Sequence, residues 1–262
     1  MEKAVHKRNF EQWSIVSKSY HNVRPTPPHA VIKIILSWLG KSPDVVVDVG
    51  CGTGLSTTIW QNIAASIIGI EPNDEMRAIA EKSTGQGSVV FKGGVSNNTS
   101  LPADYTDIVT VSQAFHWMDI DSSLAEFYRI LKPGGILAIY DFALPPVVGW
   151  ELEKAFLELR AKSTEVWYSQ ATPPVHNDKN SYADRIKSFG KFKFSREAVC
   201  HSAEQWPAQK MMDFLVHISN AEFAAKIDDG IKKDVDGFLE HMAGFNDNAE
   251  VIFPYKMVIA VK

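Results

Sequence analysis

Cysteine is scarce in this sequence: its 262 residues contain only Cys51 and Cys200. Two cysteines cannot build the disulfide framework of a small secreted domain, and they do not form a CxxC pair of the kind that binds zinc or carries out redox chemistry. The histidines show no HExxH or similar metal-binding spacing. We therefore expect neither a disulfide-stabilised fold nor a metal centre.

Long apolar runs are also absent, and neither charge is in strong excess. No stretch approaches the roughly 20 apolar residues that span a membrane, and the first residues, MEKAVHKRNFEQW, lack the apolar core of a signal peptide. The net charge is -4 and the pI is about 6.1, whereas nucleic-acid surfaces usually carry a basic excess. We expect a cytoplasmic protein that has no membrane or nucleic-acid partner.

The sequence does contain an alternation of short β-rich runs with helical periodicities. The β-rich runs between residues 44 and 142 are 45–49, 67–71, 89–91, 107–111 and 136–140. Helices are expected over 28–39, over 55–64, after an N-cap at Asn73, and around 124–131 up to a stop at Lys132-Pro133-Gly134-Gly135. Right-handed crossovers turn this order into a doubly wound, parallel α/β sheet.

The strongest local signal is the segment Asp-Val-Gly-Cys-Gly-Thr-Gly at residues 48–54, directly after a buried strand. A ligand that crosses the strand ends must approach the backbone closely, so the residues there must be small. The glycine spacing is GxGxG, and Leu55 stands where the dinucleotide fingerprint GxGxxG has its third glycine. The carboxylate of Asp48 suits the ammonium group of a methionine moiety better than a pyrophosphate.

A second acid, Glu71, ends the next β-rich run. A carboxylate at that place can accept hydrogen bonds from both hydroxyls of a ribose. Enzymes that use NAD carry an acid at the same position, so Glu71 alone does not distinguish between nucleotide cofactors.

Four blocks in order carry a family resemblance: VVVDVGCGTG, IIGIEPNDEM, TDIVTVSQAFHWMD and FYRILKPGGILAIYDF. Together they resemble the class I S-adenosylmethionine-dependent methyltransferases, in particular the small-molecule group with the trans-aconitate and ubiquinone/menaquinone-pathway enzymes. The resemblance covers residues 20–142 well and the remainder loosely. It implies a Rossmann-like, mostly parallel seven-stranded sheet with an antiparallel C-terminal strand at 251–261, and S-adenosyl-L-methionine as the cofactor.

The resemblance also implies a cofactor site, position by position. The glycine segment would bind the methionyl part, Glu71 the ribose, and the residues after the second and third strands the adenine. The implied cofactor-binding residues are Tyr20, Arg24, Asp48, Gly50, Cys51, Gly52, Gly54, Glu71, Pro72, Met76, Val95, Ser96 and Gln113. The family's usual acid is missing from the segment 94–96, so a backbone group or Ser96 is left to contact the adenine amine.

The transferable methyl group is expected near the end of the fourth strand, at residues 112–117. Aromatic rings attract a sulfonium by cation–π interaction, and the candidates are Trp13, Tyr20, Phe115 and Trp117. His116 is the candidate catalytic base, because an ordinary histidine titrates near neutral pH. A structural histidine is the alternative, and an acceptor that is already a carboxylate needs no base.

We expect a single methyltransferase domain over 1–262. Its parts are N-terminal helices or a lid (1–40), a cofactor-binding core (41–145), a helical cap with one core strand at 193–200 (146–250), and the final strand (251–262). The cap is expected to bind a small-molecule methyl acceptor. Its aromatic residues Trp150, Phe156, Trp167 and Tyr168 are expected in the core of the cap.

Two other classes of protein remain open. An NAD(P)-dependent oxidoreductase is disfavoured by the missing third glycine, and a non-catalytic cofactor-binding relative by the intact Asp48 and Glu71. An amino-methylating nucleic-acid enzyme would carry an Asn/Asp-Pro-Pro-aromatic motif where this chain has residues 113–116. The acceptor atom (O, N, C or S) and the choice between monomer and homodimer do not follow from the sequence.

Overall fold

The computed structural model describes residues 21–84, 87–169, 176–242 and 248–262. Its strands are β1 (Val45–Val49), β2 (Ser66–Ile70), β3 (Val89–Lys92), β4 (Thr106–Ser112), β5 (Leu131–Phe142), β6 (Phe194–Pro207) and β7 (Asn248–Val261). Its α-helices are α3 (His29–Leu39), α4 (Asp74–Ser83), α5 (Ile120–Ile130), α6 (Trp150–Tyr168), α7 (Tyr182–Phe189), α8 (Ala208–Ile218), α9 (Ala221–Ala224) and α10 (Asp229–Met242). Short 3₁₀ turns are η2 (Thr58–Trp60), η3 (Phe115–Trp117) and η4 (Lys179–Ser181).

The strands form one seven-stranded sheet in the order β3-β2-β1-β4-β5-β7-β6. β1 to β5 pair in parallel, while β7 runs antiparallel to both of its neighbours. This confirms the predicted doubly wound, mostly parallel sheet with an antiparallel C-terminal strand. The chain order reverses at β1, which lies between β2 and β4, and ligands of such sheets bind at the carboxyl ends of the strands beside that point.

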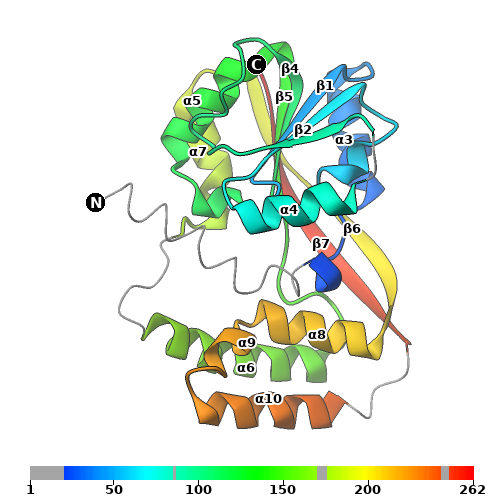
Figure 1. Ribbon diagram of the computed structural model, residues 1–262, viewed down its shortest axis with the longest axis vertical. Coiled ribbons are helices and arrows are strands. Elements are labelled where there is room, and N and C mark those ends of the chain that lie inside the picture. The colour runs from blue at the N-terminus through cyan, green and yellow to red at the C-terminus, as the bar shows by residue number, and fades with distance from the viewer. Residues whose placement is uncertain (1–20, 85–86, 170–175, 243–247) are drawn as a thin grey trace.

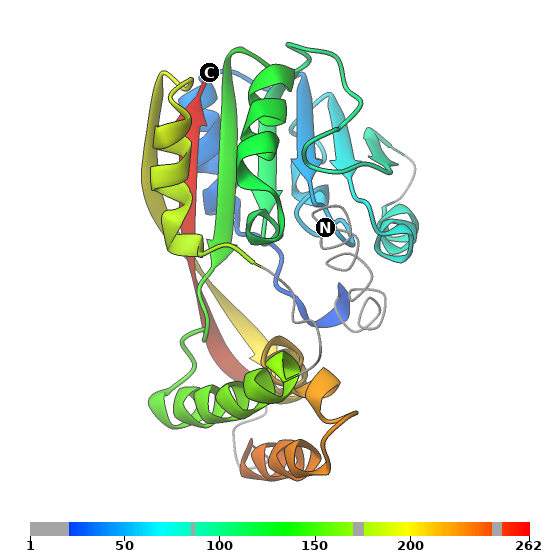
Figure 2. The same ribbon diagram turned by 90° about the vertical axis from the view of Figure 1, so that its left-hand side faces the viewer.

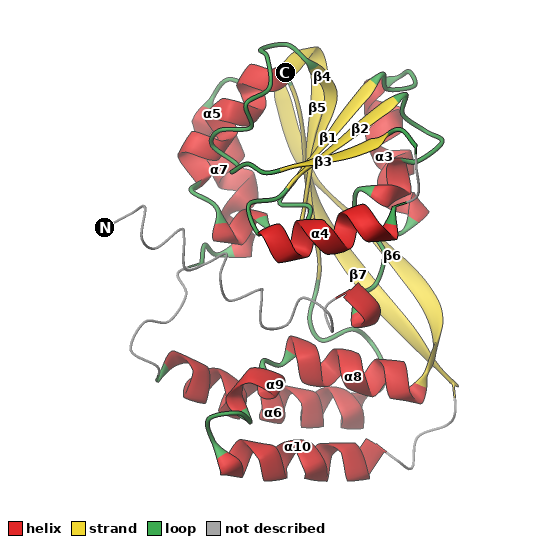
Figure 3. Ribbon diagram, in the orientation of Figure 1, coloured by secondary structure: helices red, strands yellow, loops and turns green. Residues whose placement is uncertain are grey.

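Helices cover both faces of the sheet (Figure 3). Alternate residues of β1 divide between the two faces: Val46 packs in the same apolar cluster as α3, whereas Val47 packs with α5 and α7. Both faces of the parallel strands are therefore buried, which explains why the central runs are almost continuously apolar.

A helical cap, formed by α6, α8, α9 and α10, lies beyond one end of the sheet (Figures 1 and 2). β6 and β7 pair over their whole length, from Phe194 with Val261 to Pro207 with Asn248. The β5 pairing of β7 stops at Phe142 with Tyr255, so the far half of β6 and β7 continues as a two-stranded ribbon that reaches the cap.

β5 ends at Phe142, shortly before two consecutive prolines. Phe142 is followed by Ala143-Leu144-Pro145-Pro146, and proline has no backbone N–H to donate to a neighbouring strand. One bridge, between Val147 and Ile252, ties the chain to the ribbon before α6 begins. The chain thus leaves the sheet and enters the cap within a few residues.

Two expected helical segments differ from the structure. The expected helix over 55–64 is wrong: the segment forms turns and the short η2, and Asn62 has a left-handed φ of 63°. Its run Ser56-Thr57-Thr58 favours helices poorly, and the Ser56 and Thr57 hydroxyls bind Asp48. α7 was expected in the cap, but it contacts α5, β6 and β7 instead.

The bounds of two strands also differ from those predicted from the sequence. The segment Lys132 to Gly135, expected as a turn, belongs to β5, where the pairing with β4 shifts register between Thr106 and Ile108. The strand expected at 193–200 continues to Pro207 because β7 offers it a partner along the ribbon. Among the described residues, no helix combines the length and the apolar character needed to cross a membrane.

Candidate active site

A cavity of about 1050 Å³ opens where the carboxyl ends of the parallel strands face the cap. Its walls come from the segments after β1, β2, β3 and β4 and from α6, α8 and α9. Small-molecule sites usually measure about 300–1,000 Å³, so this cavity has room for more than one small ligand.

The glycine segment after β1 forms one wall. Gly50 has φ 71°, and a Cβ there would lie 2.7 Å from the Cβ of Ala114, so only glycine fits. Gly50, Cys51 and Gly52 line the cavity. Gly54 does not line it: a Cβ at Gly54 would face Phe91 and Ala80, so this glycine serves packing between elements.

Asp48 lies beneath this wall and does not line the cavity. Its fully buried carboxylate accepts hydrogen bonds from Ser56 Oγ (2.6 Å), Thr57 Oγ1 (2.7 Å) and Thr110 Oγ1 (2.8 Å). The sequence predicted that Asp48 would contact the ammonium group of the cofactor. In the structure the Asp48 carboxylate is instead covered and bound by three hydroxyl groups. Asp48 fixes the glycine segment to the next loop and to β4.

Glu71 lies in the cavity wall at the end of β2. Its carboxylate accepts hydrogen bonds from the backbone N–H groups of Gly52 and Asn73, both at 2.9 Å. Burial raises the pKa of Glu71 to about 7, although these two N–H groups and Arg77 oppose the shift. The acid is thus anchored to the glycine segment and titrates near neutral pH.

The residues expected around adenine lie together beyond Glu71. Pro72, Met76, Val95 and Ser96 all line the cavity. Asn73 accepts a hydrogen bond from Met76 N at 2.9 Å and so begins α4 at the predicted N-cap. Ser96 Oγ accepts a hydrogen bond from Ser123 Oγ at 2.7 Å, which ties this cavity residue to α5.

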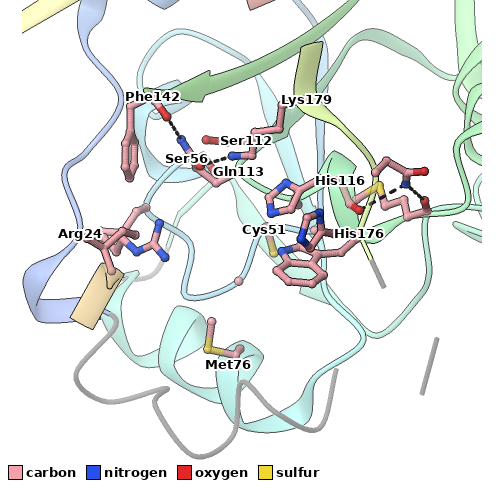
Figure 4. Close-up of a pocket in the computed structure, with 18 of the residues that line it drawn as sticks. Arg24, Cys51, Ser56, Met76, Ser112, Gln113, His116, Phe142, His176 and Lys179 are labelled. Carbon is pink, nitrogen blue, oxygen red and sulfur yellow. Dashed lines mark hydrogen bonds between the residues drawn. The ribbon is translucent and has the colours of Figure 1, made fainter. Parts of the chain in front are cut away.

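Gln113 lies at the end of β4 with a left-handed φ of 54°. Its side chain donates to the carbonyl of Phe142 at 3.5 Å and accepts a hydrogen bond from Lys179 Nζ at 3.1 Å (Figure 4). Lys179 also lies 3.5 Å from the buried carboxylate of Asp141. These contacts join the segment after β4 to β5 and η4 beside the cavity.

His116 points into the cavity next to His176 (Figure 4). Its Nδ1 is buried and has no hydrogen-bond partner in the described structure. Burial lowers the pKa of His116 well below its ordinary value, and the charges of Lys179 and His176 add to the effect. Burial therefore favours the neutral imidazole, and it also makes this ring a weaker proton acceptor than an exposed histidine.

The segment that begins at His176 closes one side of the cavity. The Asn177 side chain donates to the carbonyls of Met118 (2.8 Å) and His116 (3.3 Å), and Asn177 N donates to the His116 carbonyl at 2.8 Å. The Tyr168 hydroxyl lies 2.7 Å from His176 Nε2. Asn177 thus ties this segment to the loop that carries His116.

The aromatic residues predicted near the sulfonium do not all lie at the cavity. Trp117 lines the cavity, whereas Phe115 is fully buried on the opposite side of its turn. Arg24 lines the cavity with its guanidinium 5.6 Å from the ring centre of Phe142. Trp13 and Tyr20 lie outside the described residues.

The four aromatic residues predicted in the core of the cap also have different surroundings. Phe156 is buried in the cap as expected, but Trp150 is 73% exposed. Trp167 and Tyr168 line the cavity instead of the core of the cap.

Several cavity residues had no signal in the sequence. They include Arg160, Asn177, Lys179 and Tyr255, which come from α6, η4 with the loop before it, and β7. None belongs to a motif, and only the crossing of the cap over the strand ends brings them together. Within the described part of the chain, no group of three or more His, Cys, Asp or Glu residues could hold a metal ion.

Comparison with known proteins adds to this geometry. A family model described as a methyltransferase domain matches residues 47–139. A Dictyostelium discoideum protein provisionally named a methyltransferase is 31% identical over 134 residues, 51% of this chain and 50% of its own length. CRG1 of Saccharomyces cerevisiae, provisionally named an S-adenosylmethionine-dependent methyltransferase, is 30% identical over 146 residues, 54% of this chain and 48% of its own length. The chain thus spans about half the length of the curated relatives it matches.

A solved structure from Anaeromyxobacter dehalogenans, provisionally named a type II methyltransferase, has the same fold. It superposes with a TM-score of 0.67 and 20% identity, covering 91% of this chain and 97% of that chain. The strand order, the glycine segment and the family match all indicate the same fold and the same kind of domain. Residues 47–139 are therefore a methyltransferase domain of the class I, S-adenosylmethionine-dependent kind, whose cofactor is S-adenosyl-L-methionine.

Proposed function

We propose that the whole chain acts as a single methyltransferase unit that transfers a methyl group from S-adenosyl-L-methionine to a small-molecule acceptor. One observation carries this proposal: a single cavity joins the glycine segment and Glu71 to residues of the cap. A cofactor on the strand side and an acceptor on the cap side would meet inside it, near residues 113–117.

The residues on the strand side fit the cofactor. Gly50 and Gly52 leave space for close approach of the methionyl part, and the Glu71 carboxylate is positioned to accept hydrogen bonds from ribose hydroxyls. Met76 and Pro72 offer a polarizable, apolar wall for adenine. The Ser96 segment provides backbone groups and a hydroxyl in place of the missing acid.

The cofactor, when bound, supplies an activated methyl group on a sulfonium. The protein then has to align the acceptor in line with that group and to exclude water. Trp117 offers an aromatic face, and the neutral His116 can take the acceptor's proton when the acceptor is an alcohol or amine. Asn177 would keep the cavity closed on that side through its hydrogen bonds to the His116 loop.

The alternatives have less support. An oxidoreductase would bind a pyrophosphate at the glycine segment, where Leu55 replaces the third glycine of the fingerprint. A non-catalytic relative would not need a second compartment beside the cofactor side, nor a buried histidine in its wall whose Nδ1 has no hydrogen-bond partner among the described residues.

The test is calorimetric titration of S-adenosylmethionine and S-adenosylhomocysteine into the wild type and into Glu71→Ala. We expect micromolar binding that weakens strongly in the variant, because the ribose hydroxyls lose their acceptor. Glu75→Ala, an exposed acid on α4, is the control and should bind as the wild type does. A folded wild type that binds neither compound contradicts the proposal, and nicotinamide cofactors would then be titrated.

A further inference from the structure

A basic segment lies on the surface of this chain, whose net charge is -4. Residues 185–196 (RIKSFGKFKFSR) contain five cations and no acid. The five cations, all exposed, are Arg185, Lys187, Lys191, Lys193 and Arg196. Two acids, Asp184 and Glu197, border the segment, and five cations against two acids leave an excess of three positive charges over residues 184–197. A local excess of this kind attracts anionic surfaces.

The basic segment lies at the end of the sheet opposite to the cavity. It runs from α7 into the start of β6, where α7 packs beside β6 and β7 (Figure 2). β6 runs in the same direction as β5, because both strands pair antiparallel with β7. The start of β6 therefore lies at the amino end of the sheet, whereas the cavity opens at the carboxyl ends of the parallel strands. β6 is also an edge strand, so among the described residues no strand covers its outer side.

Several acids near this end of the sheet are already paired with other cations. Asp107 and Asp104 bind lysines that lie outside the basic segment, at 2.9 and 2.7 Å. Asp121 lies 2.8 Å from Arg185. The other four cations of the segment form no ion pair with any carboxylate that the structure describes. They are therefore available to an anionic partner.

An exposed aromatic ring accompanies these cations. Phe194 is 58% exposed, although one side of its ring stacks on Trp38 of α3, with ring centres 5.6 Å apart. In the run Lys-Phe-Lys-Phe at residues 191–194, cations alternate with rings. Aromatic side chains next to lysines favour the interface of a bilayer, because the rings enter the headgroup region while the ammonium groups stay with the charged lipid headgroups.

The position of the segment favours a lipid surface over a nucleic acid. Single-stranded nucleic acids bind by stacking their bases on free aromatic faces, whereas one face of Phe194 is covered by Trp38. A nucleic acid that served as the methyl acceptor would also have to reach the cavity, which lies at the other end of the sheet. A bilayer at the amino end of the sheet would leave the cap away from the lipid (Figure 1).

We propose that residues 185–196 form a docking surface for anionic phospholipids, with the exposed cations bound to the headgroups and Phe194 in contact with the interface. Each lysine or arginine near an anionic bilayer strengthens binding about fivefold, and salt screens this attraction. The expectation of no membrane partner rested on the net charge and on the lack of long apolar runs, neither of which describes a local surface. The inference depends on neither the cofactor nor the methyl acceptor.

Sedimentation with lipid vesicles tests the inference on the full chain. The probes are vesicles of phosphatidylcholine alone and vesicles in which about one quarter of the lipid is phosphatidylglycerol. We expect the protein to sediment with the anionic vesicles at about 0.05 M salt, to be released at about 0.5 M salt, and to stay in solution with phosphatidylcholine. A single-stranded oligouridylate is the nucleic-acid probe, and we expect no binding to it under the same conditions.

Paired substitutions assign the binding to the segment. Lys187→Gln together with Lys193→Gln removes two exposed cations, and we expect binding to anionic vesicles to weaken at least about tenfold. Lys232→Gln together with Lys233→Gln, the same loss of charge on α10 of the cap, is the control and should bind as the wild type does. Phe194→Ala should weaken binding several-fold and leave the dependence on salt unchanged, because the ring carries no charge.

Several results would overturn the inference. They are equal sedimentation with anionic and neutral vesicles, no sedimentation with either kind at low salt, and a test pair that binds as the wild type does. Equal losses in the test pair and in the control pair would mean that the charge of the whole chain, and not this surface, governs binding. Tighter binding of the oligouridylate than of anionic vesicles, lost in the test pair, would assign the surface to a nucleic acid instead.

Discussion

At the scale of single residues, two buried acids of the same nucleotide-binding edge have different tasks. Glu71 faces the cavity and is anchored by two backbone N–H groups, whereas Asp48 is covered and saturated by three hydroxyls. Both acids stand at strand ends in the sequence and look alike there. Their surroundings make one available to a ligand and the other a structural anchor.

Cofactor affinity should depend on pH through Glu71. Burial raises its pKa to about 7, so the group is largely protonated below that pH and loses acceptor capacity for ribose hydroxyls. We expect S-adenosylhomocysteine to bind more tightly as the pH rises from about 6 to about 8, and to level off above the pKa. Calorimetry over this range measures the effect.

Glu71→Gln is the control for this pH dependence. It keeps an acceptor oxygen and does not titrate, so its affinity should stay nearly constant over the same range. An equal slope in the wild type and in this variant would assign the titration to another group.

Asp48 should matter first for stability. In Asp48→Ala the hydroxyls of Ser56, Thr57 and Thr110 lose their acceptor, and we expect the free energy of unfolding to fall by about 2–4 kcal/mol. Urea denaturation measures it, with the exposed Asp44→Ala as a control expected to change stability by about 0.5 kcal/mol or less. Unchanged stability with lost cofactor binding would mean that Asp48 touches the ligand directly.

At the scale of elements, short segments without regular structure do most of the positioning. Gly50, in the turn after β1, packs closely against Ala114 in the loop after β4. Asn177, in the segment before η4, donates hydrogen bonds to the same loop. Turns with specific side-chain hydrogen bonds hold a loop in one conformation, which a helix pattern in the sequence cannot express.

Asn177 gives a test at this scale. Asn177→Ala removes both side-chain hydrogen bonds to the His116 loop while the backbone bond remains. We expect the KM for the acceptor to rise about tenfold, with the affinity for S-adenosylhomocysteine nearly unchanged. Asn180→Ala, a local and exposed contact in the same segment, should behave as the wild type does. Equal loss of cofactor and acceptor binding would show that Asn177 supports the whole cavity.

At the scale of the whole molecule, the cap is joined to the sheet by an aromatic cluster at the foot of the ribbon. Trp206 of β6 packs against Phe214 of α8 and Phe253 of β7, with ring centres 5.5 and 5.1 Å apart. Phe142 of β5 extends this contact to the sheet, 5.6 Å from Phe253. The same apolar cluster therefore runs from the sheet into the cap.

Trp206→Ala tests this connection. Removing a buried aromatic ring leaves a cavity, and we expect the free energy of unfolding to fall by about 3–5 kcal/mol. Hydrogen exchange should then rise first in α6, α8 and α10, before the parallel strands. Trp150→Ala, a tryptophan of the cap that is 73% exposed, is the control and should change little. Uniform exchange throughout the chain would mean that cap and sheet open together.

Much of the core was predictable because its signals are local. The apolar runs of β1, β2 and β4, the N-cap at Asn73 and the Gly50–Gly54 spacing each follow from neighbouring residues. The prediction of a helix after Gly54 was wrong because Asp48, eight residues before Ser56 in the chain, accepts hydrogen bonds from the hydroxyls of Ser56 and Thr57, and the helical pattern does not express these contacts. The roles of the cavity residues stay predictions, since their placement alone does not test them.

The sequence by itself determined the doubly wound sheet, the glycine segment at its switch point and the acid at the end of β2, because alternation, spacing and turn chemistry act over a few residues. Only the tertiary structure decided that Arg160, Lys179 and Tyr255 share a cavity, and that Asp48 and Gly54 do not line it. The reason is physical: the ribbon of β6 and β7 carries the cap across the strand ends, and contacts between residues so far apart in the chain leave no periodic trace in the sequence.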